Sequence, residues 1–241
     1  DYRHDEVDGE EVATTFANKG QEVRVELEHV PLGPLTGVFG LQYADTAFSA
    51  TGVEAFLPTV DTRSTGLFVV EHLEVNDRWH FEIGARHEWL RHQPRDDARS
   101  RPNFDDTATS FSGSAIWSFT PEMALTLSLS RSQRLPHAQE LYARGIHMAT
   151  NTYECGMLPN SLTCGGPAND ASYSKETSQS AEIILRKTKG ALTFSLGAFA
   201  NNVDNYIYAR TLDQFDSFRM IKYTQADVEF RGLEAEVSYQ F

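Results

Sequence analysis

Apolar and polar side chains alternate residue by residue over several stretches of this chain. Residues 79–86 read WHFEIGAR, and the same two-residue period recurs in residues 23–28, 125–130 and 192–196. Successive side chains of a β-strand point to opposite faces, so this period indicates strands with one apolar and one polar face. The polar faces carry too many charged and hydroxyl groups for a packed core. The pattern predicts an all-β protein.

The last stretch interrupts this period at Gly232. Val228 and Phe230 precede the glycine, and the apolar positions after it, from Leu233 to Phe241, are shifted by one residue. A β-bulge or a glycine inside a strand produces such a shift. We expect residues 228–241 to form one strand.

Short and long connections alternate along the chain. Short segments rich in turn-forming residues lie at 31–34, 76–77, 120–122 and 188–190. Long polar segments lie between them, at about 5–20, 45–61, 92–108, 132–173 and 211–220. All short turns then meet at one end of the sheet and all long loops at the other, as in bacterial outer-membrane barrels. We predict an antiparallel up-and-down transmembrane β-barrel with short periplasmic turns and long extracellular loops.

The strand count predicts only part of a barrel wall. We count about ten strands, including a short one at residues 2–4, whereas barrels that hold a plugged lumen have about 22. We therefore expect residues 1–241 to be a partial barrel without its plug domain and closing strands. Several aromatic residues lie near strand ends, where membrane proteins carry interfacial girdles: Trp79, Trp89, Trp117, Phe119, Tyr206, Tyr208 and Tyr239.

Composition narrows the environment and the partners. The chain contains no run of about 18 apolar residues, which excludes a membrane-spanning helix. A mean hydropathy of -0.42 is compatible with barrel strands, because alternation keeps the average polar. The net charge of -13, with no Lys/Arg-rich run, argues against nucleic acid as a partner and suits cations better.

The two cysteines of the chain are close in sequence. Cys155 and Cys164 enclose a short segment containing Pro, Asn and Gly. Such a pair can form a disulfide within an exposed loop if the compartment is oxidising. Two unrelated free thiols remain the alternative.

Familiar catalytic signatures are missing from the sequence. It contains no Gly-rich phosphate loop, no nucleophile elbow and no paired CxxC motif. Residues 87–92, HEWLRH, are one residue too long for the zinc-protease helix motif, and on a strand the two histidines point to opposite faces. We expect no enzymatic activity.

One segment carries a family resemblance. Residues 134–154 read RLPHAQELYARGIHMATNTYE, with Arg-x-Pro followed by Glu-Leu-Tyr at the start of a long loop. This segment resembles TonB-dependent receptors of the outer membrane, and its second half, from Gly145 to Glu154, resembles their zinc-uptake branch. Residues 2–6, 49–55, 205–209 and 230–234 agree with that branch, so the resemblance spans essentially the whole chain.

The resemblance implies a location, partners and a mode of action. Receptors of this family are plugged barrels in the outer membrane of Gram-negative cells, surrounded by outer-membrane lipid. They import scarce nutrients with energy that the TonB complex delivers through the plug. By resemblance, we expect Zn²⁺ as the transported ligand and no catalytic cofactor.

The zinc branch also implies a metal site inside the barrel mouth. The two barrel-loop ligands of that branch match Glu54 and His147 here. One carboxylate and one imidazole leave two positions of a tetrahedral zinc site for the plug to fill. His137 and Glu140, in the same loop as His147, are weaker candidates, as is the acidic cluster at residues 4–6.

Three other interpretations stay open. A receptor of the same architecture could carry a siderophore, haem or cobalamin complex, in which case changing Glu54 and His147 would leave uptake unaffected. A passive porin or surface adhesin would have no plug domain. A soluble all-β enzyme or binding module would expose its polar strand faces and share the other face as a core.

Overall fold

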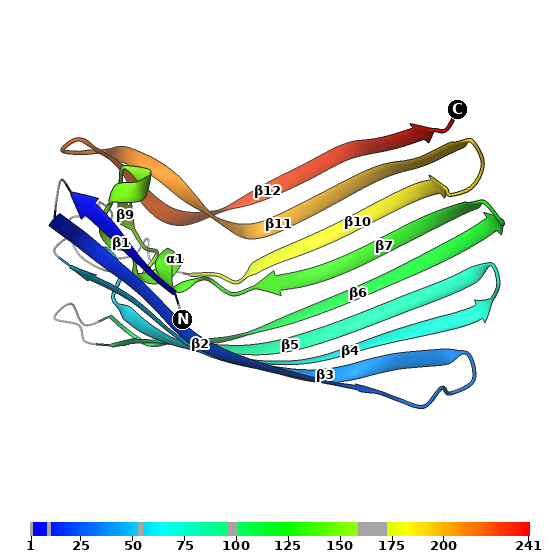
Figure 1. The fold of residues 1–241 in the computed structure, drawn as a ribbon, viewed down its shortest axis with the longest axis horizontal. Coiled ribbons are helices and arrows are strands. Elements are labelled where there is room, and N and C mark those ends of the chain that lie inside the picture. Colours follow the sequence, from blue (N-terminus) through cyan, green and yellow to red (C-terminus); the bar gives the residue numbers. More distant parts are fainter. Residues whose placement is uncertain (1, 9–10, 53–54, 96–100, 159–172) are drawn as a thin grey trace.

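The computed structural model describes residues 2–8, 11–52, 55–95, 101–158 and 173–241, and these form one continuous sheet (Figure 1). Its strands are β1 (Tyr2–Asp8), β2 (Glu11–Glu28), β3 (Leu35–Gly52), β4 (Thr59–Asn76), β5 (Trp79–Arg95), β6 (Phe104–Thr120), β7 (Met123–Arg134), β8 (Arg144–His147), β9 (Thr152–Cys155), β10 (Glu176–Lys187), β11 (Leu192–Phe215) and β12 (Phe218–Tyr239). Two short helices, α1 (Ala138–Tyr142) and η1 (Met148–Thr150), lie between β7 and β9.

Most strands pair with their neighbours in sequence. The sheet order is β1 to β7, then β10, β11 and β12, and each of these neighbours is antiparallel. This is the up-and-down wall that the alternation predicts, and its ten strands among the described residues confirm the expected number. β9 and β8 extend the sheet beyond β12, and β9 runs parallel to β12.

The wall has one exposed apolar face. Ile83 of β5, Leu127 of β7 and Ile183 of β10 are 62%, 47% and 45% exposed on it. The rings of Trp79 and Trp117 stack at 5.7 Å between centroids near the short turns, and Trp89 is exposed ten residues further along β5. Ten residues match the roughly 9–11 residues that a tilted barrel strand needs to cross the hydrocarbon core of a bilayer. The spacing is that of two aromatic girdles around an apolar belt.

The short turns lie where the sequence places them, at 29–34, 77–78, 121–122 and 188–191. The opposite end differs from the prediction, because the described parts of the polar segments at 5–20 and 211–220 lie mainly in strands. β1 and β2 pair out to Asp8 and Glu11, and β11 and β12 pair out to Phe215 and Phe218. A hairpin beyond the membrane satisfies its backbone groups by cross-strand hydrogen bonds whatever its side-chain polarity, so a polar composition does not end a strand.

Strand β12 continues through Gly232 as one strand. No bulge occurs there, so Gly232 is a glycine inside a strand. Gly232 pairs with Phe199 of β11 in a regular register. The apolar period shifts because Phe230 lies on the polar face together with Glu234, two residues to either side of the glycine. The register irregularities between β11 and β12 instead fall between Val203 and Tyr206 and further along the hairpin.

Residues 135–158, within the connection between β7 and β10, are called the mouth loop. It contains α1, β8, η1 and β9, and it lies at the loop end of the wall between β12 and the β2–β3 side (Figure 1). Neither helix in the described chain has the length and apolarity that crossing a membrane requires.

Candidate functional site

An ion-pair network attaches the mouth loop to the wall where β7 ends. The guanidinium of Arg134 donates to both carboxylate oxygens of Glu176, the first residue of β10, at 2.9 Å. Its Nη1 also donates to Glu140 of α1, at 2.9 and 3.1 Å. These hydrogen bonds to two carboxylates raise the pKa of Arg134 above its ordinary value. One side chain thus joins β7, β10 and α1.

The Glu-Leu-Tyr segment folds as the short helix α1 and has distinct roles at each position. Glu140 accepts a hydrogen bond from the backbone N–H of His137 at 2.8 Å and so caps the helix. Leu141 and Tyr142 are fully buried, packed with Val60 and others from β4, β6 and β11. The Tyr142 hydroxyl donates to the carbonyl of Pro102 at 2.9 Å. The helix is therefore fixed over the sheet rather than projecting from it.

The β8–β9 hairpin connects the two sides of the wall at its loop end. β9 pairs in parallel with residues 219–222 of β12. On the other side, the backbone N–H of Arg144 donates to the carbonyl of Phe56, between β3 and β4, at 2.7 Å. Gly145 allows this approach: its φ is 146°, and a Cβ there would lie 3.1 Å from Phe56. The hairpin thus spans the polar face near the mouth.

His147, the last residue of β8, is held against two aromatic rings. Its imidazole stacks on the Phe56 ring, with 4.3 Å between centroids and 19° between planes. The ring centroid of Phe16, in β2, lies 6.4 Å from that of His147. Nδ1 of His147 donates to Oε1 of Glu154 at 2.7 Å. Both the plane of the ring and its rotation within that plane are therefore constrained.

Glu154 is a buried carboxylate with partners on both oxygens. The residue is 2% exposed, and besides His147 it accepts hydrogen bonds from Gln139 at 2.7 Å and from the Tyr223 hydroxyl at 3.2 Å. Burial favours a higher pKa for Glu154, but the hydrogen bonds from His147 and Gln139 outweigh it and hold the pKa below its ordinary value. Glu154 is thus an ionised acceptor at the centre of the mouth loop.

The structure describes only some of the other predicted site residues. Glu54 and Cys164 lie outside the described residues, while Cys155 is disulfide-bonded. His137 is exposed, and Glu140 is engaged by Arg134 rather than placed beside His147. In the described part of the chain, no three His, Cys, Asp or Glu side chains are grouped so as to hold a metal ion. Within the described residues, His147 therefore belongs to no such group.

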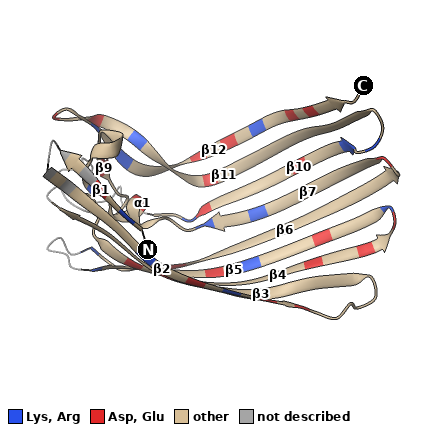
Figure 2. Ribbon diagram, in the orientation of Figure 1, with Lys and Arg blue, Asp and Glu red and all other residues tan. Residues whose placement is uncertain are grey.

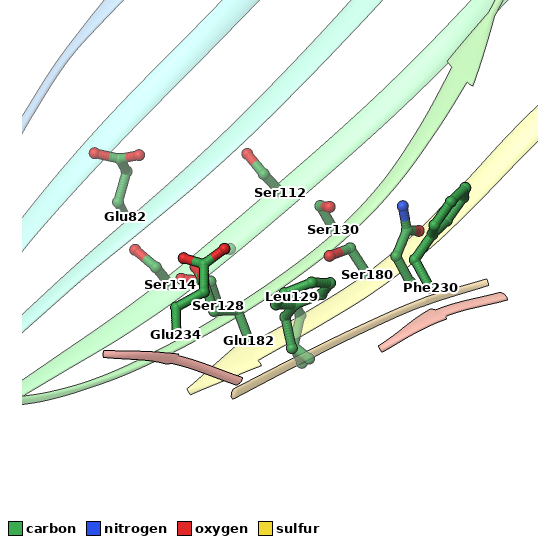
Figure 3. A pocket seen from close by; sticks show the side chains of 13 residues that line it. Glu82, Ser112, Ser114, Ser128, Leu129, Ser130, Ser180, Glu182, Phe230 and Glu234 are labelled. Carbon is green, nitrogen blue, oxygen red and sulfur yellow. The ribbon is translucent and has the colours of Figure 1, made fainter. Parts of the chain in front are cut away.

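Below the mouth loop, the polar face of the wall forms a hollow of about 700 Å³ (Figure 3). Cross-strand pairing sets serines side by side in it, Ser114 opposite Ser128 and Ser112 opposite Ser130. Glu82 in this hollow shares the face of β5 that carries His92, which contacts the mouth loop. The lining residues are Glu82, Ser112, Gly113, Ser114, Ser128, Leu129, Ser130, Ser180, Glu182, Phe199, Asn201, Phe230 and Glu234.

Charge in this hollow is of one sign. Glu82, Glu182 and Glu234 contribute carboxylates, and no Lys or Arg is among the described residues that line it. Figure 2 shows further acidic residues along β4, β5 and β12. A polar, acidic concave face beneath the mouth favours cations over anions.

Sequence reasoning missed the roles of Glu154, Phe56 and Gln139. Glu154 lies in the quoted segment, but its contact with His147 requires the β8–β9 pairing, in which His147 faces Thr152 and Gly145 faces Glu154. Diagonal neighbours on one face of such a pair are within reach of long side chains. The closely spaced apolar–polar alternation around residues 144–155 was the available signal for that hairpin.

Comparison with known proteins agrees with this architecture. The family model described as "TonB dependent receptor-like, beta-barrel" matches residues 2–241. The chain belongs to this family. The receptor resemblance expected from residues 134–154 is therefore confirmed at the level of the family, whose members are receptors rather than enzymes, while its zinc-uptake branch is not shown by these matches.

Solved structures share the fold of this receptor wall at low sequence identity. The copper transporter OprC has a TM-score of 0.75 and 14% identity over 94% of this chain and 35% of its own. The Serratia marcescens hemophore receptor HasR, solved with its hemophore HasA and haem, has a TM-score of 0.69 and 16% identity over 95% of this chain and 40% of its own. The FrpB iron transporter from Neisseria meningitidis has a TM-score of 0.63 and 11% identity over 95% and 34%. The chain spans between a third and two fifths of these proteins.

Proposed function

We propose that this chain is the wall and mouth of a TonB-dependent receptor in the outer membrane of a Gram-negative cell, and that the receptor imports a scarce metal ion, zinc. Energy would come from the TonB complex through a plug region, and the exposed apolar belt of the wall would face outer-membrane lipid. The chain performs no reaction. Zinc is cargo in this proposal, held briefly at the mouth before it passes inward.

The single observation that supports a metal cargo is the position of His147. It is held at the mouth by the ring of Phe56, which is two residues from Glu54 in the sequence. The resemblance implies Glu54 and His147 as the two barrel ligands, so this contact supports the proposal that their segments act together. An imidazole and a carboxylate are both ordinary zinc ligands.

The electrostatics of the wall suit a cationic cargo. The hollow beneath the mouth presents Glu82, Glu182 and Glu234, and the chain carries a net charge of -13. Negative walls raise the local concentration of cations and speed their capture. The proteins with a similar fold include a copper transporter, a hemophore receptor solved with haem and an iron transporter, so copper, haem and iron are the rival cargoes to be tested.

The proposal is tested by uptake in cells that express the full-length receptor under zinc limitation. Labelled zinc uptake is compared between wild type, His147→Ala, Glu54→Ala and the double variant, at equal surface expression. His80→Ala is the matched control, because His80 lies at the short-turn end of β5. We expect selective loss of zinc uptake in the His147 and Glu54 variants and none in the control.

Parallel arms distinguish the rival cargoes. Copper ion, a ferric siderophore and haem are offered to the same strains in separate assays. Uptake of one of these that does not depend on His147 and Glu54, together with no zinc uptake by the wild type, would retire the zinc proposal. The receptor would then belong with the copper, siderophore or haem receptors of the same architecture.

A further inference from the structure

The contact between His147 and Glu154 defines which nitrogen of the imidazole carries the proton. Glu154 Oε1 lies 2.7 Å from Nδ1 of His147, and an ionised carboxylate only accepts hydrogen bonds. Nδ1 is therefore the donor. In a neutral imidazole with a protonated Nδ1, Nε2 is the nitrogen with the lone pair that can bind a metal.

The geometry points to Glu154 as a positioning residue that fixes the tautomer and the rotation of His147, so that Nε2 is the atom presented to the transported metal ion. This inference rests on the proposed function, since it assigns a role toward the same cargo. Glu154 itself does not touch the metal in this assignment. It acts through His147, as carboxylates do behind many metal-binding histidines.

Glu154 is well placed for such a role because it is itself immobilised. Its second oxygen accepts hydrogen bonds from Gln139 of α1 and Tyr223 of β12, so elements from three parts of the fold orient the carboxylate. The residue is 2% exposed, which protects these hydrogen bonds from competition by water. A solvent-exposed carboxylate on a mobile side chain would not hold the imidazole in this way.

A second contact fixes the degree of freedom that Glu154 leaves open. The hydrogen bond to Nδ1 sets the direction of the ring edge, but the ring could still tilt about that bond. Stacking on Phe56 at 19° between planes limits this tilt. Both contacts restrict where Nε2 points, which lowers the entropy that a metal ion has to remove on binding.

The test uses the full-length receptor, purified in detergent, with zinc ion alone as the probe and a chromophoric chelator as competitor. Glu154→Gln keeps the size of the side chain but removes the obligate acceptor. We expect the zinc dissociation constant to rise about 10–100-fold, the usual effect of removing such a partner. Asp105→Asn controls for the loss of one negative charge at the same end of the wall, because Asp105 is exposed there.

A spectroscopic readout separates positioning from folding. ¹⁵N spectra of histidine-labelled, metal-free receptor, with His147→Ala for assignment, report the tautomer. We expect a protonated Nδ1 in wild type and a mixture of tautomers in Glu154→Gln. Hydrogen exchange of residues 144–158 should show the same protection in the wild type and in Glu154→Gln. This measurement is needed because a folding defect would also reduce the affinity for zinc.

The outcomes distinguish this inference from the proposed function. If wild type and His147→Ala bind zinc equally, the metal proposal fails. If His147→Ala loses binding but Glu154→Gln binds as wild type does, only the role of Glu154 is overturned. A neutral His147 imidazole protonated at Nε2 in the metal-free wild type also overturns the role of Glu154. This outcome can be read even if Glu154→Gln loosens the mouth loop.

Discussion

Arg134 and Glu176 form a two-pronged ion pair across 42 residues of sequence, with both N–O distances at 2.9 Å. Arg134 is the last residue of β7 and Glu176 the first residue of β10, so the pair closes the base of the mouth loop. Glu176 also accepts the backbone N–H of Ile207 in β11 at 2.8 Å. The loop is thus anchored to three neighbouring wall strands at one point.

Replacing Arg134 by lysine should loosen the mouth loop while leaving the wall intact. An ammonium retains the charge but cannot reproduce the planar fork that serves Glu176 and Glu140 together. The free energy of loop opening should fall by about 1–2 kcal/mol. The carboxylates of Glu140 and Glu176 are largely buried, so a lost hydrogen bond is costly, but Arg134 is partly exposed, so water offsets part of the loss. Hydrogen exchange of residues 135–158 in the full-length receptor measures this opening.

The control for this change is Arg131→Lys on the same strand. Arg131 is exposed and three residues away, so its replacement should not alter exchange in the mouth loop. Equal exchange in the wild type and Arg134→Lys would mean that the burial of α1, and not the ion-pair network, holds the loop.

Gly232→Ala should destabilise the pairing of β11 with β12. A Cβ at this position would lie 2.5 Å from the Phe199 ring, which occupies the space above the glycine. The ring must move, and overpacking of this kind costs about 1–3 kcal/mol. We expect a lower urea midpoint for unfolding. The unfolding is measured on gels, where a folded barrel changes its migration on heating.

A rescue and a control accompany the glycine variant. Phe199→Leu should recover part of the stability of Gly232→Ala, because it removes the ring that the new methyl group meets. Gly197→Ala, in β11, should be nearly neutral, since the nearest atom to a Cβ there is 3.8 Å away. A Gly232→Ala barrel as stable as the wild type would show that the ring relaxes at no cost.

Local sequence patterns determine the wall but not the mouth. The strands and the short turns follow from a two-residue period and from turn chemistry, both of which involve neighbouring residues only. The outer hairpins were mistaken for loops because their polarity reports exposure to water, not the absence of pairing. The pairing of β11 with β12 out to Phe215 shows that solvated strands continue well past the apolar belt.

The mouth site depends on contacts that no local pattern contains. His147 could be proposed from the resemblance, but Phe56 stacks on it from about 90 residues earlier in the chain, and Tyr223 reaches Glu154 from 69 residues later. These contacts arise from the way the mouth loop crosses between the two sides of the wall. The sequence therefore predicts a segment for the candidate site, and the fold determines which residues surround His147.

Cys155 should be linked to Cys164 in the receptor isolated from the outer membrane. Cys155 is disulfide-bonded in the structure, and the chain contains two cysteines. Peptide mapping without reductant should recover both in one linked fragment. Replacing both by alanine should ease loop opening by about 2–3 kcal/mol, the loop-closure value for a ring of roughly ten residues. Labelling of both thiols in untreated protein would contradict this pairing.

Acidification should release the mouth loop through His92, near the end of β5 and beyond Trp89. Burial lowers the pKa of His92 below its ordinary value of 6.5, and a nearby His137 charge adds to this effect. The neutral ring donates from Nε2 to the carbonyl of Pro136 at 3.0 Å, while Nδ1 accepts from the Thr62 hydroxyl at 2.7 Å. Protonation would place a proton on Nδ1, facing the Thr62 hydroxyl, and would bury a positive charge on the ring.

The sign of the effect follows from the direction of the pKa shift. The open loop takes up a proton near pH 6.5, whereas the closed loop does so only at a lower pH, so closure is strongest above 6.5 and weakens as the pH falls toward the lowered pKa. Hydrogen exchange of residues 135–158, corrected for the intrinsic rate, should therefore rise between pH 7.5 and 5.5. Glutamine in His92→Gln cannot titrate but can still donate to the Pro136 carbonyl. Hydrogen exchange in this variant should therefore lack the part of the pH dependence that His92 causes. If the pH dependence is the same in His92→Gln and the wild type, other groups in the mouth loop control its opening.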